Sequence, residues 1–497
     1  MFSIIVPPVT CHKLDPHSGF PFIPHMAGYL ASAINNEDYE VQIIDAFSNN
    51  PEQAVKYKDF MFLGMRVDEI VNSISNDSKG IFIYARTIID YEIIRIIISE
   101  IKKKLDIKII LFENTQCVDA LALEPIYKDI FELGVDFLIF GEPERRIRQI
   151  LDQIITDRKI AIKGVAYKIN NETYFNNEIP YHKDLDDISF PLWEKWNLNG
   201  YWRINYSHPP SKQGDRFVTL ITSRGCPFRC TFCVAPEINP TWRYRSAKNV
   251  VDEMEYFHKK LNVNDFHISD FNPTIRENRF IEICNEILKR NLDITWKIAQ
   301  GTKIETIKHN GTINLFYRAG CRFLSFSPES GSKEVMKNIV NKPFNHKRAL
   351  EVTKRMYQVG IRTQACFVVG MPGERFKHRL ESLIYMIKLS IAGVDEVACY
   401  IITPVPGAKI FGHQELGGFK SLSECSHTPT WRKDFVKLYT FRMIFYLTFI
   451  FIKSLIHPIA SVKLFFRIFY KNFETKMEMS IFKKYRLIRQ SMNAKMY

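Results

Sequence analysis

The stretch RGCPFRCTFC, residues 224–233, places Cys226, Cys230 and Cys233 within eight residues. It follows the apolar run FVTLITS, residues 217–223, which is typical of a buried β-strand, and Gly225 and Pro227 mark it as a loop. Structural zinc needs four ligands in a closed tetrahedron, and no fourth Cys or His lies within a few residues. An iron–sulfur cluster also normally takes four thiolates, so three on a [4Fe–4S] cluster leave one iron open. An open metal position indicates a catalytic centre rather than a structural one.

The middle of the chain continues this strand–helix alternation. Helical patterns, such as residues 247–261 and 279–290, separate the predicted strands. These strands cover residues 217–223, 265–271, 295–301, 321–330, 362–370 and 396–407. Six strands with crossover helices predict a partial (β/α)6 barrel or a curved open sheet, and the cysteine loop lies at its functional end.

The first third of the chain predicts an α/β domain with a doubly wound, Rossmann-like parallel sheet. Its expected strands are residues 2–8, 39–45, 80–86, 107–113 and 135–142. No GxGxxG motif follows the first strand, so a dinucleotide site has little support, and a scaffold domain without a ligand is an alternative. We expect domains at residues 1–160 and 206–424, a connector at 161–205 and a helical C-terminal region at 425–497.

Cysteine usage and the start of the chain bear on its location. Ten cysteines are spread along 497 residues with one tight cluster, and MFSIIVPPVT lacks the basic region of a signal peptide. We therefore expect a cytoplasmic protein without a disulfide scaffold.

With these segments in place, the sequence resembles the radical S-adenosylmethionine (SAM) superfamily. CPFRCTFC matches its CxxxCxxC signature, FSPESG resembles its ribose-side segment, and GIRTQACFVVGMPGE resembles its adenine-side segment. ITPVPGAKIF is similar to the branch with an N-terminal cobalamin-binding domain, which includes anaerobic magnesium-protoporphyrin cyclase and hopanoid-modifying enzymes. The resemblance covers roughly residues 1–420. It implies Cys226, Cys230 and Cys233 as ligands of a [4Fe–4S] cluster, and Phe232, Ser327, Glu329, Gly370, Pro372 and Gly373 as cofactor-binding residues.

The resemblance implies an enzyme that cleaves SAM to a 5′-deoxyadenosyl radical and modifies a small, apolar metabolite. An electron donor such as flavodoxin or ferredoxin would reduce the cluster. Two outcomes stay open: cobalamin-dependent methylation, and cyclisation or rearrangement without cobalamin. Transfer RNA modification loses support because the N-terminal domain carries only Cys11 and Cys117, too few for a second cluster. The barrel segments argue against a non-enzymatic metal-binding module.

The N-terminal domain departs from its cobalamin-binding relatives in one turn. Those relatives usually end the fourth strand in Gly-Gly, which lets the backbone approach the corrin. Here that place holds Glu113, Asn114, Thr115 and Gln116, and a DxHxxG motif is absent. The segment GEPE, residues 141–144, matches the usual GEGE well. The sequence therefore leaves cobalamin binding open, with a domain that only encloses the substrate as the alternative.

Two interpretations are open for each of four other polar residues. Asp270 and Asn272, at the end of the second barrel strand, are expected either to bind substrate or to cap a helix. Arg243 and Arg245 are expected either to hold an anion or, slightly favoured, to form a surface pair. Cys321, Cys366 and Cys399 lie in predicted strands and are expected to be buried small hydrophobes.

The tail carries most of the net charge of +14. Residues 431–497 hold fourteen Lys and Arg but three Asp and Glu, mixed with the apolar runs MIFYLTFIFI (443–452) and LFFRIFY (464–470). The first run has ten uncharged residues, too few for a spanning helix. The two runs predict two helices with a break near Pro458. These helices would either contact a membrane surface peripherally, which would favour a lipid-like substrate, or pack on the barrel as a cap. Nucleic-acid binding is not expected, because the charges alternate with long apolar runs.

Overall fold

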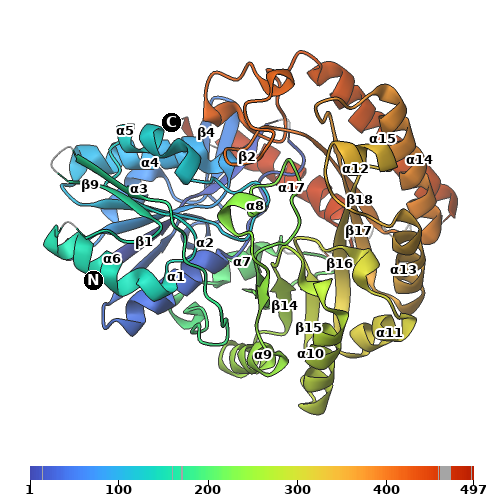
Figure 1. The fold of residues 1–497 in the computed structure, drawn as a ribbon, viewed down its shortest axis with the longest axis horizontal. Helices are drawn as coiled ribbons and strands as arrows, with labels where there is room; N and C mark the ends of the chain where they lie inside the picture. Colours follow the sequence, from blue (N-terminus) through green and yellow to red (C-terminus); the bar gives the residue numbers. More distant parts are fainter. Residues whose placement is uncertain are drawn as a thin grey trace.

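Two open sheets, one from the first third of the chain and one from its middle, organise the structure (Figure 1). This computed structural model describes residues 1–13, 15–158, 160–169, 172–206, 208–456, 458, 472–493 and 495–496. The fold is a mixed α/β fold with parallel sheets, as the sequence predicts.

The first sheet contains the five predicted N-terminal strands. Its strand order is β10-β9-β8-β7-β6-β1-β3, with β3, β1, β6, β7 and β8 mutually parallel. Their bounds are β1 Phe2–Val6, β3 Val41–Asp45, β6 Ile81–Ala85, β7 Ile109–Glu113 and β8 Phe137–Ile139. The helices between them are α1 His25–Asn36, α2 Ala46–Asn49, α3 Val67–Asn72, α4 Tyr91–Lys104, α5 Tyr127–Glu132 and α6 Ile147–Thr156.

Two regions of the N-terminal part differ from the expectation. The stretch 161–205, expected as a connector, contains the antiparallel hairpin β9 Val165–Ile169 and β10 Glu172–Asn176, which extends the first sheet, and the helix α7 Asn199–Ile204. A smaller, four-stranded sheet was not predicted. It contains β2 Val9–His12, β4 Ala54–Tyr57, β5 Phe60–Leu63 and the C-terminal β19 Lys495–Met496. The domain bounds themselves stay a prediction.

The middle of the chain forms a six-stranded, all-parallel sheet in the order β11-β14-β15-β16-β17-β18. The strands are β11 Phe217–Leu220, β14 Asp265–Ile268, β15 Thr295–Ile298, β16 Cys321–Glu329, β17 Arg362–Val369 and β18 Glu396–Ile401. The first and last strands do not pair, so the sheet is open, and its curvature as a partial barrel stays a prediction. Its helices are α8 Ala235–Ile238, α9 Ala247–Leu261, α10 Glu277–Lys289, α11 Asn310–Arg318, α12 Lys333–Asn338, α13 His346–Val359 and α14 Phe376–Ala392.

The described part of the C-terminal region contains the helices α15 Phe435–Ile456 and α17 Lys476–Asn493 besides the strand β19. The run LFFRIFY lies outside the described residues. By length and composition, α15 is one described helix that is long and apolar enough to cross a membrane, with 28% of its most apolar window buried. The same test is passed by core helices of soluble proteins, so it is weak evidence for a membrane span.

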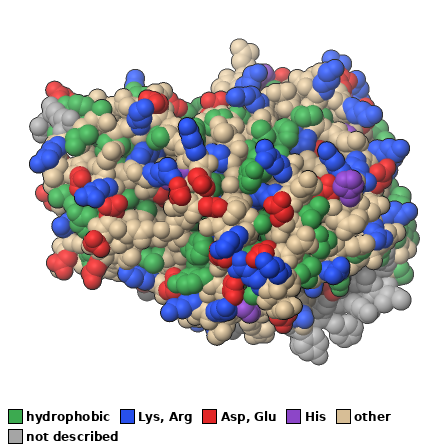
Figure 2. Space-filling model, turned by 60° about the horizontal axis from the view of Figure 1, so that its bottom comes forward, with side chains coloured by type: hydrophobic (Ala, Val, Ile, Leu, Met, Phe, Trp, Pro, Cys, Tyr) green, Lys and Arg blue, Asp and Glu red, His purple; other side chains and the backbone are tan. Residues whose placement is uncertain are grey.

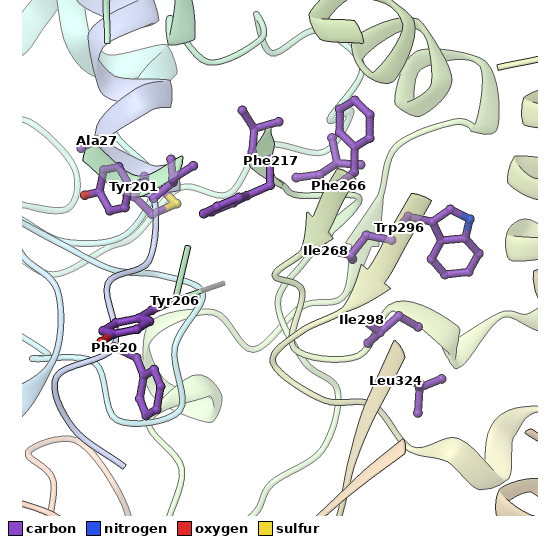
Figure 3. Close-up of a cluster of buried hydrophobic side chains, with 14 of the residues drawn as sticks. Phe20, Ala27, Tyr201, Tyr206, Phe217, Phe266, Ile268, Trp296, Ile298 and Leu324 are labelled. Carbon is purple, nitrogen blue, oxygen red and sulfur yellow. The ribbon is translucent and has the colours of Figure 1, made fainter. Parts of the chain in front are cut away.

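One large hydrophobic core joins both sheets and the C-terminal helices. It runs from Phe2 in β1 through Trp296 in β15 to Met479 in α17. Figure 3 shows the central part, where Tyr201 and Tyr206 lie on the side of the first sheet and Ile298 and Leu324 on the side of the second. The two sheets therefore share packing, which fixes how the cysteine loop faces the N-terminal part.

On the face shown in Figure 2, Lys and Arg side chains are interspersed with Asp, Glu and apolar side chains. They do not gather there into the continuous basic stripe that is typical of nucleic-acid-binding surfaces.

Candidate functional site

The cysteine loop leaves the second sheet through a tight turn. After β11, a short strand β12 Ser223–Arg224 pairs with β13 Arg243–Tyr244, and the loop begins at Gly225. Gly225 has φ of +78°, and a Cβ there would collide with the carbonyl of Thr241, so glycine is required. The backbone N–H of Cys226 then donates to the carbonyl of Asn239 at 3.1 Å, which anchors the start of the loop.

The three cysteines share one environment, with Phe232 packed against them. Cys226 and Cys233 are buried and Cys230 is half-buried. Burial raises the pKa of all three thiols, that of Cys230 to about 12, so stable thiolates there need a nearby positive charge. The Cys233 sulfur already accepts from the N–H of Ala235 at 3.3 Å. Such N–H···S bonds also support metal-bound thiolates.

These residues fit a [4Fe–4S] cluster better than a single ion. Among the described residues, no three His, Cys, Asp or Glu side chains are grouped closely enough to hold one metal ion. In a [4Fe–4S] cube each thiolate binds a different iron atom, so the ligands need not meet at one point. Three thiols in one apolar setting supply that donor set, and iron would supply the positive charge that their thiolates need.

The side chains of Asp270 and Asn272 do not cap a helix, and their role in substrate binding stays a prediction. Asp270 is fully buried and accepts three hydrogen bonds, from the N–H of Thr222 at 2.7 Å and from the hydroxyls of Thr222 and Ser223, each at 2.6 Å. The amide of Asn272 donates to the Cys226 sulfur at 3.7 Å and makes no helix-capping bond. Both side chains position the cysteine loop.

Asp270→Asn is expected to loosen the cysteine loop. The amide can accept with only one oxygen, so at least one buried donor loses its partner, which costs ~1–3 kcal/mol. We expect cluster iron to be released to a chelator about tenfold faster than from the unaltered protein, on the same principle. The exposed Asp293→Asn is the matched control. An Asp270→Asn protein that keeps its iron as long as the control would contradict this role.

Ser327 and Glu329 lie beside the cysteine loop, at the end of β16. Glu329 is buried in the left-handed region, at φ +55°, and burial raises its pKa. It accepts from Lys342 Nζ at 2.8 Å, and the same ammonium donates to the Ser327 carbonyl at 2.6 Å. The Lys342 charge also lowers the pKa of Cys230 against the larger effect of burial. Lys342 was missed, because nothing in the sequence NKPF marks a buried lysine.

Gly370, Pro372 and Gly373 form the turn after β17, and both glycines have positive φ. The N–H of Gly370 donates to Glu374 Oε2 at 2.6 Å, and burial raises the pKa of Glu374 to about 7. A Cβ on Gly370 would meet Leu438 of α15 at 2.6 Å. This turn therefore packs on the C-terminal region, and its nucleoside-binding role stays a prediction.

The expected surface pair of Arg243 and Arg245 is wrong. Arg245 is buried, where it pairs with Glu253 of α9. Arg243 is buried and binds Glu142 of the GEPE segment through two bonds of 2.7 and 2.9 Å. Arg224 binds Glu144 of the same segment at 2.8 Å. The GEPE segment thus ties the first sheet to the start of the cysteine loop.

A cavity of about 490 Å³ lies between the two sheets and is lined on one side by the C-terminal region. The carboxyl ends of β1, β6 and β7 reach it near Val9, Arg86 and Asn114. It borders the cysteine loop, because Val118 in its wall accepts a hydrogen bond at 3.3 Å from the N–H of Val234, next to Cys233. Its position between the sheets makes it the candidate substrate site.

Four of the charged side chains that line the cavity form ion pairs: Asp90 binds Arg86 at 2.9 Å, and Asp119 binds His427 at 3.1 Å. The opposite charges of Lys476 and Glu396 also line the cavity, and the Glu396 carboxylate accepts from the backbone N–H of Lys476. Burial alone would lower the pKa of His427, but its bond to Asp119 raises it to about 9. Burial lowers the pKa values of the lining residues His17 and His25 to about 3 and 4, so both are neutral at pH 7. The described lining therefore presents no net charge.

The other strand cysteines divide into two groups. Cys321 and Cys399 are buried, as expected. Cys366 is half-buried and lines the cavity, so it is more than a core residue. Cys117 of the N-terminal part lines the same cavity and donates to Asp119 at 2.8 Å.

Comparison with known proteins supports the resemblance. Residues 220–385 match the Radical SAM superfamily, so the chain contains a radical SAM domain, with the [4Fe–4S] cluster and SAM that this domain implies. Cytidylyl-2-hydroxyethylphosphonate methyltransferase of Streptomyces wedmorensis is 27% identical over 51% of this chain and 48% of its own length. Anaerobic magnesium-protoporphyrin IX monomethyl ester cyclase of Rubrivivax gelatinosus is 30% identical over 57% and 49%. The chain thus spans about half the length of these curated relatives.

Among solved structures, the radical SAM methyltransferase TsrM of Kitasatospora setae, with cobalamin and a [4Fe–4S] cluster bound, is similar in fold. The TM-score is 0.61 at 16% identity, covering 82% of this chain and 76% of TsrM. The similarity therefore extends beyond the radical SAM domain to most of the chain.

Proposed function

Because residues 220–385 form a radical SAM domain, we propose that this chain modifies an uncharged, largely apolar small molecule in the cavity between its two sheets. The observation that carries the proposal is the cavity itself, which borders the cysteine loop and whose described lining carries equal numbers of positive and negative side chains. A charged substrate would find no net countercharge there, and burying an unbalanced charge is costly.

The chain's own residues would act mainly by holding the cofactors in place and by shielding the reaction from water. A [4Fe–4S] cluster on Cys226, Cys230 and Cys233 supplies, when bound, the electron that opens the SAM sulfonium and releases a 5′-deoxyadenosyl radical. Asn272 donates to the Cys226 sulfur, and hydrogen bonds of this kind tune the potential of a cluster. The enclosure of the cavity by both sheets and the C-terminal region limits water and side reactions. We propose a cytoplasmic enzyme, a flavodoxin or ferredoxin as electron donor and no nucleic-acid partner.

Methylation with cobalamin is the reaction we propose first. The carboxyl ends of β1, β6 and β7 open into the cavity, which is where a doubly wound sheet binds its ligand. The fold shared with TsrM, whose structure contains cobalamin, supports this use of the N-terminal part.

Cyclisation or rearrangement without cobalamin is the second candidate, and one turn favours it. Thr115 and Gln116 are fully buried where cobalamin-binding relatives usually carry Gly-Gly. Thr115 contacts Met26 through its hydroxyl, so the turn is filled by side chains. Side chains in this place hinder the close approach of a corrin.

Product analysis tests the proposal and separates the two candidates. After anaerobic reconstitution with iron, sulfide and hydroxocobalamin, the reduced protein is expected to convert SAM to 5′-deoxyadenosine. Retained corrin absorbance after gel filtration, together with S-adenosylhomocysteine, would support methylation. Deoxyadenosine alone, with no retained corrin, would support cyclisation or rearrangement. A protein that carries its cluster and yields neither product, by chromatography and mass spectrometry, would contradict the proposed function.

A further inference from the structure

Two neighbouring helices carry most of the strongly exposed apolar side chains of the structure. Helices α14 and α15 pack against each other at the outer edge of the second sheet (Figure 1). Large apolar side chains on these two helices are 62–73% exposed at Phe376, Ile391, Val436, Leu447, Phe451 and Leu455. Elsewhere in the described part of the chain, Tyr485 alone reaches this exposure among large hydrophobics. We call the outer surface of α14 and α15 the α14–α15 face.

The α14–α15 face is not needed for packing within the described chain. Helix α15 already buries Leu438, Phe445 and Phe449 on its inner side, where it contacts β18. A surface helix is normally polar on its outer side, and a helix that is apolar all round is normally buried in protein or lipid. Monomeric soluble proteins rarely expose contiguous apolar surface of this kind without a binding role.

Charge favours an anionic lipid surface as the partner. Lys388 on α14 and Lys437 on α15 are exposed among the apolar side chains, whereas the exposed Lys377 of α14 is paired with Glu334 at 2.9 Å. Helix α15 contains no Asp or Glu along its 22 residues. Lysines interleaved with exposed Leu, Ile and Phe are the composition of segments that lie in a membrane interface.

The contacts of α15 favour a position on the fold over a span by this helix. Lys453 Nζ donates to the carbonyl of Val394 at 2.7 Å, and the Tyr446 hydroxyl accepts from the N–H of Cys399 at 2.9 Å. These bonds hold the helix along the second sheet. A membrane could therefore contact its outer side without the helix leaving the fold.

The α14–α15 face also reaches the mouth of the cavity. Ile450 of α15 is 49% exposed and lines the cavity. Phe22 and Ile481 are likewise exposed and line it, so the rim is apolar. An apolar molecule dissolved in a membrane could pass over this rim without crossing water.

We propose that the α14–α15 face docks on an anionic bilayer surface, so that the cavity receives a lipid-like substrate from the membrane. The substrate part of this inference rests on the proposed function, whereas the docking part rests on the surface alone. Docking on the bilayer neither forms nor breaks a covalent bond.

Vesicle sedimentation of the full chain tests the docking. The chain is expected to pellet with vesicles of phosphatidylcholine and phosphatidylglycerol in three-to-one proportion, and to bind pure phosphatidylcholine much more weakly. Leu447→Glu/Phe451→Glu should weaken binding about 100-fold, because two inserted side chains become charged. Lys388→Ala/Lys437→Ala should weaken it roughly 20-fold at low salt, and high salt should remove this difference.

The matched control is Ile155→Glu/Ile160→Glu, which changes two exposed apolar residues of the N-terminal part. It should bind vesicles like the unaltered chain. A full-length chain that stays in the supernatant with anionic vesicles at low salt would overturn the proposal. Equal binding of the Leu447/Phe451 variant and the control would also overturn it. Cluster content and SAM cleavage, measured without vesicles, report separately on the proposed function.

Discussion

Replacing Cys226, Cys230 or Cys233 with Ala is expected to abolish cluster binding and SAM cleavage. Three thiolates already leave one iron without a protein ligand, and two cannot hold a [4Fe–4S] cube in place. We expect each single variant to lose nearly all reconstituted iron and sulfide and to form no 5′-deoxyadenosine. The measurement is iron and sulfide analysis after anaerobic reconstitution and gel filtration, with electron paramagnetic resonance of the reduced protein.

The control for this result is Cys321→Ala, which removes a buried thiol from β16 outside the loop. It should keep its full iron and sulfide. If the unaltered protein took up one tightly bound zinc ion and no sulfide-containing cluster, the assignment of the loop would fail. The same holds if any loop variant kept its full complement of iron.

The cysteine loop could be predicted from the sequence because its chemistry is local. Cys226, Cys230 and Cys233 are close in space because they are close along the chain. The buried parallel strands were also predictable, since each is a short apolar run between turn residues, as in β6 and β17. The order of strands within each sheet was not predicted, because right-handed crossovers fix the hand of a connection but not which strands become neighbours.

The parts that were missed depend on contacts between distant residues. Strand β19 at Lys495–Met496 pairs with Val55 and Lys56 of β4, and no local sequence pattern indicates such a pairing. The hairpin β9–β10 is polar on one strand, so it resembled a connector. Its pairing with β8 becomes visible only in the folded sheet.

The polar network around the loop was hidden for the same reason. In the sequence, Arg243 follows the cysteine loop and is charged, which is typical of an exposed residue. Its partner Glu142 lies 101 positions away in the GEPE segment. The sequence showed that GEPE matches a family motif but not what its two glutamates do. In the structure they form the ion pairs that join the first sheet to the strands flanking the cysteine loop.

Glu142→Ala is therefore expected to be among the most destabilising substitutions outside the apolar core. Glu142 is fully buried, binds Arg243 through both carboxylate oxygens and lies 3.7 Å from Arg224. Removing it leaves a buried guanidinium without its counterion, which costs ~3–5 kcal/mol. Urea unfolding followed by circular dichroism measures this loss. The control Glu178→Ala breaks an exposed pair with Lys163 and should change the free energy of unfolding by less than about 1 kcal/mol.

The same carboxylate predicts how stability depends on pH. Burial alone would raise the pKa of Glu142, but Arg224 and Arg243 outweigh burial and lower it from 4.5 to about 2. A group whose pKa is lowered by folding stabilises the fold above its unfolded pKa, and this contribution is lost as pH falls through the folded pKa. The unaltered protein should thus lose this part of its stability between about pH 4.5 and 2. Glu142→Gln cannot ionise, so its free energy of unfolding should start lower and fall less steeply over that range. Parallel curves for the two proteins would show that Glu142 does not carry the interaction between the sheets.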